Sequence, residues 1–318
     1  MKISENETVN FEETAPLDSR FFAPQPVPWR VQFGALSHRG NVRHNNEDHF
    51  AVIRRKRSRE VLLTNMPPDD LALRDDESYV MIVADGMGGA AFGELASRLA
   101  LKAADELVGS AGYWITQLHE IGTRQTQDRI QAYADVIHQT LLEYGHLDPR
   151  LSGMGTTLTC AHVLGDDVII AHVGDSRAYH FHGGQIQQIT RDQTLAQELL
   201  DAGMPREATV RFRHILTNCL GGDARAVQMD VYHLRLDEGD ALLLCSDGLS
   251  DLLDDPELAQ VLEFYATAQG ACERLLRMAL DRGGKDNITV VVGRFQAAAD
   301  RAAAVESQRD LDAAYGGN

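Results

Sequence analysis

Runs of apolar residues separated by turn signals predict most of the secondary structure of this chain. The run YVMIVA at 79–84 is continuously apolar, as expected of a strand that is covered on both faces. Farther along, apolar residues fall every four positions at Leu95, Leu99, Ala103 and Leu107 and predict an amphipathic helix. The chain therefore combines buried strands with helices that cover them.

Short strands and short helices follow one another in groups along the rest of the chain. Strands are expected at 50–53, 157–163, 167–173, 177–182, 185–189, 229–236, 241–245 and 287–295. Helices are expected at about 128–144, 195–202, 256–268 and 270–281, with an irregular segment over 204–220. Because regular βαβ alternation is missing, the pattern favours an α+β layered fold with mainly antiparallel sheets over a doubly wound parallel sheet.

The regular pattern runs over residues 31–296 without a linker, which predicts one domain of catalytic size. Residues 1–30 are polar and end in a proline-rich stretch, so we expect a flexible N-terminal arm. Residues 297–318 are rich in alanine and charge and are expected to form a C-terminal tail. A basic run followed by an acidic stretch at 54–78 predicts an inserted, solvated loop rather than a nucleic-acid patch.

Composition narrows the class of protein. The 318 residues include 47 Asp and Glu against 30 Lys and Arg, a formal net charge of −17, which argues against a surface for nucleic acid or anionic membrane. The apolar runs are too short to cross a bilayer, and no apolar signal stretch opens the chain. The four cysteines are too far apart for a zinc knuckle or a disulfide scaffold. We therefore expect a cytoplasmic protein.

Acidic residues stand at or near the ends of five predicted strands. They are Glu47 and Asp48 before FAVI, Asp85 after VMIVA, Asp175 after IIAHV, Asp247 after ALLLC, and Asp286 before ITVVV. One Asp-Gly pair at a strand end is ordinarily just a turn. Stacked strands, however, are expected to carry these carboxylates to one edge of the layers, where they repel one another unless a cation is present.

Hard divalent cations match such a group of oxygen ligands. Mg²⁺ or Mn²⁺ takes one or two carboxylates and keeps several waters. Two such ions bridged by one aspartate hold a hydroxide between them that is suited to in-line attack on phosphorus. An arginine then completes the site by holding the phosphate oxygens.

Seven segments of the chain carry a family resemblance. They are GNVRHNNEDHF (40–50), VADGMGG (83–89), SGMGTTLT (152–159), AHVGDSRAYHF (171–181), LTNCLGG (216–222), LLLCSDGLSDLL (242–253) and GGKDNITVVV (283–292). In this order they resemble the metal-dependent protein phosphatases (PPM, or type 2C, serine/threonine phosphatases) of the bacterial type. The resemblance covers about 31–296 and implies a central β-sandwich of two antiparallel sheets flanked by α-helices, in four layers α-β-β-α.

The same resemblance implies a Mn²⁺- or Mg²⁺-dependent hydrolysis of phosphoserine and phosphothreonine in proteins. Asp85 is expected to bridge two core ions, with the carbonyl of Gly86 as a further ligand. Asp247 and Asp286 are expected to bind the first ion, and Glu47 is expected to lie on the side of the second ion.

Other positions are expected to support this centre. Asp48 matches a residue that hydrogen-bonds water on the ions, and Asp175 matches an acid that helps Asp247 to hold a weaker third ion. Arg43 is expected to bind the substrate phosphate. Asn287, beside the ligands, is expected to be a structural partner.

Two departures from the family pattern leave questions open. Met87 stands where animal members often carry a histidine that is proposed as the general acid, so a water on the metals is the favoured proton donor. Residues 192–220 correspond to the family's flap and its surroundings, and Gln193-Thr194 replaces the more usual His-Ser. The flap shapes substrate choice, so specificity does not carry over from relatives.

Three functions are consistent with these residues. The favoured one is an active phosphatase acting on phosphorylated protein substrates within the pathway of a cognate serine/threonine kinase. The others are a silent phosphoprotein-binding module, and a phosphatase for a small metabolite or for an anti-sigma antagonist. We expect a monomer that binds neither nucleic acid nor membrane.

Overall fold

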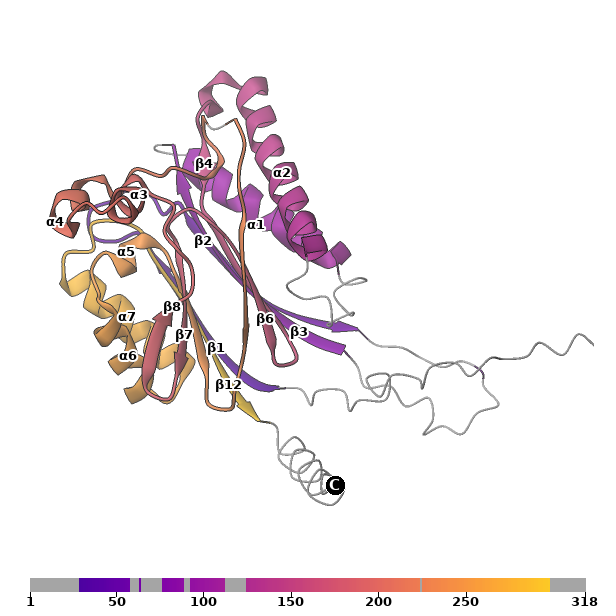
Figure 1. Cartoon of the computed structure of the whole chain (residues 1–318), viewed down its shortest axis with the longest axis vertical. Coiled ribbons are helices and arrows are strands. Elements are labelled where there is room, and N and C mark those ends of the chain that lie inside the picture. Colours follow the sequence, from indigo (N-terminus) through magenta and orange to yellow (C-terminus); the bar gives the residue numbers. More distant parts are fainter. Residues whose placement is uncertain are drawn as a thin grey trace, which may run out of the picture.

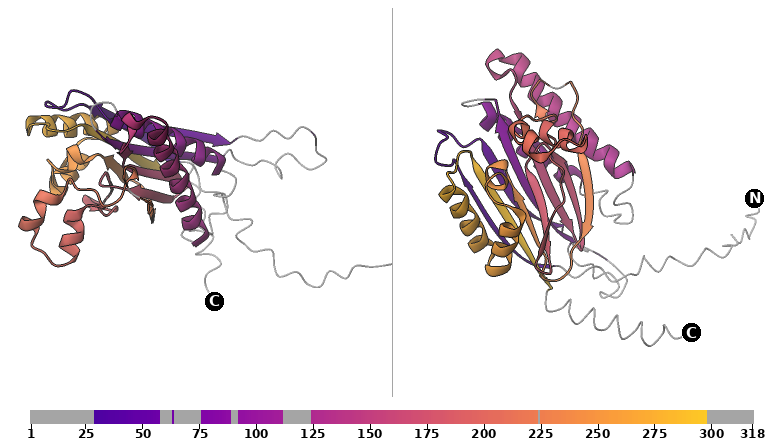
Figure 2. Two further views of the ribbon diagram at one scale, coloured as in Figure 1. Left: turned by 90° about the horizontal axis from the view of Figure 1, so that it is seen from above. Right: turned by 60° about the vertical axis from the view of Figure 1, so that its left-hand side comes forward.

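The computed structural model describes residues 29–57, 63, 76–88, 92–111, 124–223 and 225–297 (Figure 1). Two antiparallel sheets lie face to face, and helices lie against their outer faces (Figures 1 and 2). The expected four-layer α+β sandwich is therefore confirmed. Residues 1–28 of the arm expected over 1–30, the central part of the expected insertion, and the expected tail from residue 298 on lie outside the described residues. Trp29 and Arg30, expected in the arm, belong to the first strand of the domain, and Ala297, expected in the tail, belongs to the last.

The first sheet has five strands in the order β1-β12-β11-β7-β8. Their bounds are β1 Trp29–His38, β7 Arg177–His182, β8 Gln185–Gln188, β11 Ala241–Cys245 and β12 Ile288–Ala297. The second sheet has seven strands in the order β10-β6-β5-β3-β4-β9, and β2 pairs with β3. Their bounds are β2 Asp48–Arg57, β3 Asp76–Met87, β4 Gly155–Thr156, β5 Leu158–Leu164, β6 Asp167–Val173, β9 Leu220–Gly221 and β10 Asp230–Arg235.

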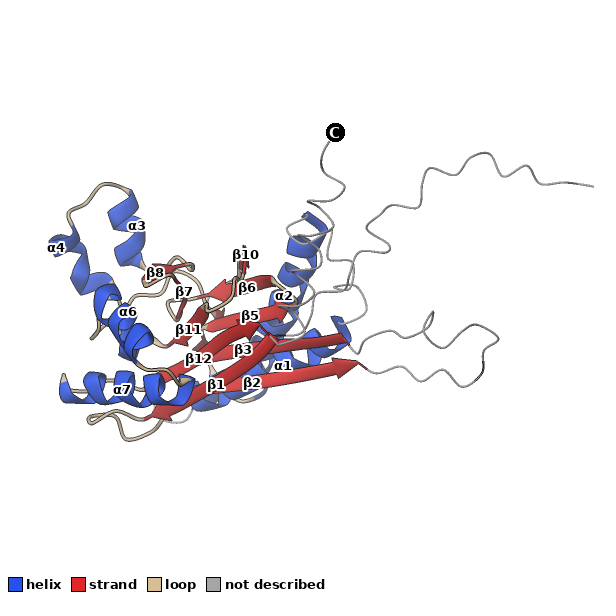
Figure 3. Cartoon of the chain, turned by 90° about the horizontal axis from the view of Figure 1, so that it is seen from below, coloured by secondary structure: helices blue, strands red, loops and turns tan. Residues whose placement is uncertain are grey.

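Helices form the two outer layers (Figure 3). The second sheet is covered by α1 Phe92–Ala111 and α2 Arg124–Leu147, and the first by α6 Asp255–Phe264 and α7 Ala268–Asp281. Shorter elements are η4 Pro149–Leu151, α3 Leu195–Asp201, α4 Arg206–Thr209, η5 Val210–Phe212 and α5 Asp247–Ser250. A search of the described helices finds none with both the length and the apolar character needed to cross a membrane.

The layering explains why the central strands are apolar throughout. In β11, Leu243 packs outward into the cluster beneath α6 and α7, whereas Leu242 and Leu244 pack inward between the two sheets. Side chains alternate along a strand, so a strand covered on both faces needs apolar residues at every position. The same alternation carries Val291 of β12 inward.

Capping fixes where the helices of the first outer layer begin. Asp254 accepts a hydrogen bond from the backbone N–H of Glu257, and Glu257 reaches back to the Asp254 N–H, which is a capping box at the start of α6. Pro256 lies in the first turn, as the sequence predicts. Thr267 caps α7 in the same manner, by accepting from the N–H of Gly270.

The expected loop at 54–78 is wrong at both ends, because β2 continues to Arg57 and β3 starts at Asp76. The charged residues pair across the strands and toward the neighbouring helix. Lys56 Nζ lies 3.3 Å from Glu77 Oε2, and Arg55 Nη2 lies 2.6 Å from Asp105 Oδ1 on α1. The charges that suggested a solvated loop thus belong to strand residues, which form ion pairs across the strands and with α1.

The amphipathic helix expected from Leu95 and Leu99 is confirmed as α1, and both pack partly buried against the core cluster. The most deeply buried apolar residues of α1 are small, namely Ala96, Ala100 and Ala104. Alanines allow the helix to approach β3 closely. The segment 204–220, expected to be irregular, contains α4, η5 and β9.

Candidate metal centre

Two acids of the second sheet face each other at the end where the centre forms. Asp48, the first residue of β2, is the direct cross-strand partner of Asp85 near the end of β3. Opposed residues in an antiparallel pair have side chains about 5 Å apart, and like charges there repel. The strand register thus places two carboxylates together.

The first sheet brings three more acids to the same end. Cys245, the last residue of β11, pairs with Arg177 at the start of β7 and with Val290 near the start of β12. Acids two to four residues beyond these positions therefore lie at one end of the sheet. They are Asp175 before β7, Asp247 after β11 and Asp286 before β12.

The acids from the two sheets form a single electrostatic cluster. Burial, and then repulsion from Asp48, Asp247 and other neighbours, raises the pKa of Asp85 well above its ordinary value. Burial, and then repulsion from Asp175 and others, does the same to the pKa of Asp247. Without positive charge, these side chains resist ionisation.

Asp48 has a buried carboxylate oxygen that lacks a hydrogen-bond partner among the described residues. Its side chain is only 4% exposed, and Ser246 Oγ donates a hydrogen bond of 2.7 Å to Oδ2. The other oxygen, Oδ1, is buried and has no hydrogen-bond partner among the described residues. Burial raises the pKa of Asp48 to about 6. An orphaned buried oxygen beside other carboxylates fits a hydrated cation.

Glu47 reaches the centre because Gly93, in the first turn of α1, has no side chain to block it. A Cβ on Gly93 would lie 2.3 Å from Glu47 Oε2, and a Cβ on Gly86 would lie 2.1 Å from the Gly93 carbonyl oxygen. The Gly86 N–H donates to the Glu47 carbonyl at 3.2 Å. Gly93 therefore permits the close approach, a role that sequence reasoning missed.

Asn287 holds the loop that carries these groups. Its Oδ1 accepts from the Glu47 N–H at 2.7 Å, and its Nδ2 donates to the carbonyls of Arg39 and Asn45 at 3.1 and 2.8 Å. On the opposite sheet, Thr157 Oγ1 accepts from the Asp85 N–H at 2.9 Å. Buried amide and hydroxyl groups thus fix the backbone beside the acids.

Arg43 extends from the same loop over the acidic end. Its Nη2 lies 2.6 Å from Asp286 Oδ2, and its side chain is 57% exposed. An exposed guanidinium beside a cluster of carboxylates can bind a phosphate group that enters from solvent.

Comparison with known proteins shows which family the chain belongs to. A family model described as Protein phosphatase 2C matches residues 63–281. The chain belongs to the protein phosphatase 2C family. It is 31% identical over 257 residues to the serine/threonine phosphatase stp of Listeria innocua, covering 80% of this chain and 92% of that relative. It is 34% identical over 267 residues to the serine/threonine protein phosphatase PstP of Mycobacterium tuberculosis, covering 82% of this chain and 44% of that relative.

Solved structures of the protein phosphatase 2C family share the fold. The crystal structure of Mycobacterium tuberculosis PstP/Ppp aligns with a TM-score of 0.66 at 31% identity, covering 84% of this chain and 99% of that one. The PstP catalytic domain in complex with two manganese ions aligns with a TM-score of 0.64 at 31% identity, covering 85% of this chain and all of that one. An all-oxygen donor set with one orphaned carboxylate oxygen fits such ions in this phosphatase 2C domain as well.

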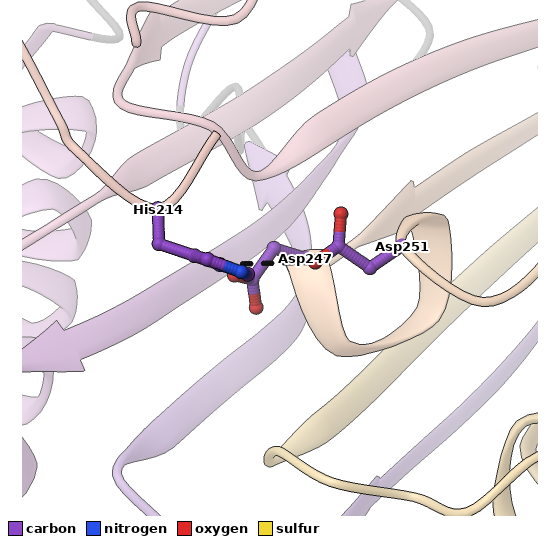
Figure 4. Close-up of side chains that lie close together, drawn as sticks. All are labelled: His214, Asp247 and Asp251. Atoms are coloured by element: carbon purple, nitrogen blue, oxygen red, sulfur yellow. Dashed lines mark ion pairs between the residues drawn. The ribbon is translucent and has the colours of Figure 1, made fainter. Parts of the chain in front are cut away.

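A separate group of potential ligands lies where the flap, residues 192–220, meets this centre. One ligand atom each from His214, Asp247 and Asp251 lies within 4.8 Å of the others (Figure 4). Asp247 and Asp251 stand at the start and just past the end of α5, and His214 reaches them from the flap. Asp175, the partner expected for Asp247, is not in this group, although its charge raises the pKa of Asp247.

Sequence reasoning missed both His214 and Asp251. The four-residue spacing between Asp247 and Asp251 was a usable signal, because it places both on one face of a helical turn. His214 had no such signal, since the path of the flap follows no period. Only the folded chain brings it to α5.

His180 and His182 alternate along β7, a spacing that is also found in metal sites. Here both imidazoles contact Asp240. His180 Nε2 lies 2.7 Å and His182 Nδ1 lies 2.6 Å from the two oxygens of Asp240. Asp240 is 1% exposed and precedes β11, so the trio lies at the opposite end of the sheet from Asp247. Both rings partner a buried carboxylate there.

The acid cluster predicts that the metal-free protein becomes less stable to unfolding as the pH rises. Burial raises the pKa of Asp48 to about 6 and that of Asp175 to about 7, so the folded state binds protons that the unfolded chain releases. The free energy of unfolding in EDTA therefore falls as pH rises from about 4 to about 7. We expect Asp85→Asn, which removes one charge, to raise that free energy at pH 7.5 by about 1 kcal/mol or more, one pKa unit being worth ~1.4 kcal/mol.

Urea unfolding in EDTA at pH 5 and pH 7.5 measures both effects. Asp128→Asn, an exposed substitution on α2, is the matched control and is expected to leave the midpoint unchanged. Addition of Mn²⁺ is expected to stabilise the wild type more than Asp85→Asn. A less stable Asp85→Asn in EDTA would contradict the electrostatic account.

Proposed function

We propose that this protein is a metal-dependent phosphatase that removes phosphate from phosphoserine and phosphothreonine in proteins. The observation that carries the proposal is the meeting of carboxylates from five strand ends around the unpartnered oxygen of Asp48. Family membership supports it, since the relatives named above are serine/threonine phosphatases.

Each acid has a task in the proposed centre. Asp85 opposes Asp48 and feels the charges of Asp247 and other acids of the opposite sheet, so it is assigned to hold both core ions, with the Gly86 carbonyl beside it. Asp247 and Asp286 are assigned to the first ion, and Glu47 to the second. Two bound Mn²⁺ or Mg²⁺ ions would lower the pKa of a water molecule and neutralise negative charge on the phosphate.

The other polar residues orient the reactants. Asp48 Oδ1 is assigned to accept a hydrogen bond from water in the centre, and the Ser246 hydroxyl holds the carboxylate for this. Arg43 is assigned to leave Asp286 and to bind two phosphate oxygens in its planar fork. Met87 has no proton to give, so we assign protonation of the leaving serine or threonine oxygen to water.

The competing functions differ in what they need from the acids. A silent phosphoprotein-binding module has no use for a full set of metal acids, and this chain has Asp85, Asp247, Asp286 and Glu47 in place. A phosphatase for small metabolites or for an anti-sigma antagonist uses the same centre. Comparison of turnover on several phosphopeptides and on small phosphate esters distinguishes it.

The cellular setting is also part of the proposal. We assign the protein to the cytoplasm, as a monomer acting opposite a serine/threonine kinase on shared substrates. The four cysteines are free, buried thiols, which is consistent with a reducing compartment.

Substitution of the bridging and first-ion acids is expected to abolish turnover. Asp85→Asn and Asp247→Asn each remove a charged ligand, and we expect kcat/KM for a phosphothreonine peptide with Mn²⁺ to fall about 10³-fold or more, or about 4 kcal/mol. The exposed Asp128→Asn serves as the control. Activity of either ligand variant near that of the wild type would refute the proposed centre.

Substitution of Arg43 is expected to affect binding more than chemistry. Arg43→Ala removes the fork that holds phosphate, so KM rises by about 10-fold or more while kcat falls less. Arg43→Lys is expected to recover only part of the loss, because an ammonium lacks the planar fork. Steady-state kinetics on the same peptide measure both, and an unchanged KM in Arg43→Ala would rule out the role.

A further inference from the structure

The two ends of the flap meet at one buried glutamine, Gln193. This residue is 7% exposed and follows Asp192, where the chain leaves the sandwich for the flap. Its backbone carbonyl accepts a hydrogen bond of 2.9 Å from the Thr217 N–H, on the returning segment of the flap. One residue farther out, Thr194 and Leu216 form a β-bridge. The flap therefore has a closed base, in which its outgoing and returning segments are hydrogen-bonded to each other.

The side-chain amide of Gln193 uses both its oxygen and its nitrogen. Oε1 accepts from Asn218 Nδ2, on the returning segment, at 2.9 Å and from the backbone N–H of Gly174 at 2.8 Å. Nε2 donates to Asp230 Oδ2, at the start of β10, at 2.8 Å. Because a backbone N–H only donates and a carboxylate only accepts, these partners fix which end of the amide is the oxygen. One side chain thus joins the flap to the turn after β6 and to β10.

Gly174 is the link between this amide and the metal centre. It immediately precedes Asp175, and its carbonyl accepts from the Gln193 N–H at 2.8 Å, so Gln193 binds both polar groups of the glycine backbone. Its φ is +104°, and a Cβ there would lie 2.5 Å from Thr157 Cγ2. Thr157 in turn accepts from the Asp85 N–H. The base of the flap is therefore anchored beside Asp175 and, through Thr157, beside Asp85.

Other bonds fix the outgoing end of the flap even without the amide. Arg177 donates to both oxygens of Asp192 at 2.8 and 2.6 Å. His172, which is fully buried, has Nε2 3.1 Å from the carbonyl oxygen of Arg191. Loss of the Gln193 amide is therefore expected to release the returning end of the flap while the sandwich stays folded.

The outer part of the flap lies at the rim of the same centre. His214 approaches Asp247 (Figure 4), and Arg213 Nε lies 3.1 Å from Asp251 Oδ2. Arg213 is 43% and His214 is 60% exposed, so these contacts hold the flap less firmly than the buried bonds at its base. A peptide whose phosphate enters the centre extends past this rim, whereas a small phosphate ester does not.

We propose that Gln193 is a positioning residue that holds the flap in register with the metal centre, and so sets how well a phosphopeptide is used relative to a small phosphate ester. An amide oxygen has two lone pairs and the amide nitrogen donates, which allows all three bonds. A neutral imidazole has one acceptor and one donor, so the more usual histidine at this position allows only two. The inference rests on the proposed function, because it concerns the substrate of that same centre.

Reversal of a single bond tests the role. Gln193→Glu keeps the shape and the accepting oxygen but places a second carboxylate against Asp230. We expect kcat/KM for a phosphothreonine peptide to fall about 10-fold, mainly through KM, against about twofold or less for p-nitrophenyl phosphate. Addition of Asp230→Asn, which supplies a donating amide, is expected to restore the peptide value. Asp230→Asn alone and Gln187→Glu, at an exposed glutamine of β8, are the controls and are expected to behave as wild type.

The kinetic outcomes separate this inference from the proposed function. Equal losses on both substrates in Gln193→Glu, or a peptide loss that Asp230→Asn does not relieve, would overturn the positioning role. Absence of turnover of both substrates by the wild type with Mn²⁺ would instead refute the phosphatase function.

Hydrogen exchange of the full-length protein tests the anchor without turnover. In Gln193→Ala the Gly174 amide loses its acceptor, so we expect it to exchange about 10-fold faster or more, together with faster exchange over residues 195–215. Gln187→Ala is the matched control and is expected to exchange as the wild type does. Unchanged exchange at Gly174 and across the flap in Gln193→Ala would overturn the proposal.

Discussion

Repulsion among carboxylates at one end of the sandwich is the constraint on which the rest of this structure depends. The strand register opposes Asp48 to Asp85, and three acids of the other sheet end at the same place. Two of the five, Asp48 and Asp175, are less than a tenth exposed. Charges in such positions destabilise a fold by several kcal/mol unless they are paired. Protein groups supply part of that compensation, through Ser246 and Arg43, and bound divalent cations would supply the rest.

The remainder of the domain makes that end rigid. The strands pack in three apolar layers, one between the two sheets and one between each sheet and the helices that cover it. Asn287 and Thr157 then fix the backbone of the acids by hydrogen bonds, so the carboxylates cannot separate to relieve their repulsion. As metal ligands, acids held in this way would be in place before any ion binds, which favours affinity and catalytic geometry.

Much of this could be predicted from the sequence, and the misses have physical reasons. The bounds expected for 167–173, 177–182 and 241–245 agree with the structure because short apolar runs between turn signals define a buried strand well. The ends of β2 and β3 were missed because their charges are satisfied by cross-strand partners that no local pattern reveals. The acids were singled out because they stand at or beside the ends of strands.

The flap was the least predictable part, and it holds His214, which only the folded chain brings to α5. Its elements are short, and its ties to the sandwich are long-range: Arg177 with Asp192, and Arg213 with Asp251. Neither pairing has a sequence period. The flap is thus joined to the sandwich by ion pairs between side chains, whereas the acids proposed as core ligands stand at the ends of buried strands.

The central claim is that the gathered carboxylates form a site for divalent ions, and anomalous diffraction from crystals grown with Mn²⁺ tests it most directly. The account predicts two strong anomalous peaks that share Asp85 as a common ligand, one of them also beside Asp247 and Asp286. Crystals soaked in Mn²⁺ that show no anomalous peak in contact with Asp85, with Asp48 Oδ1 still lacking any partner, would contradict it.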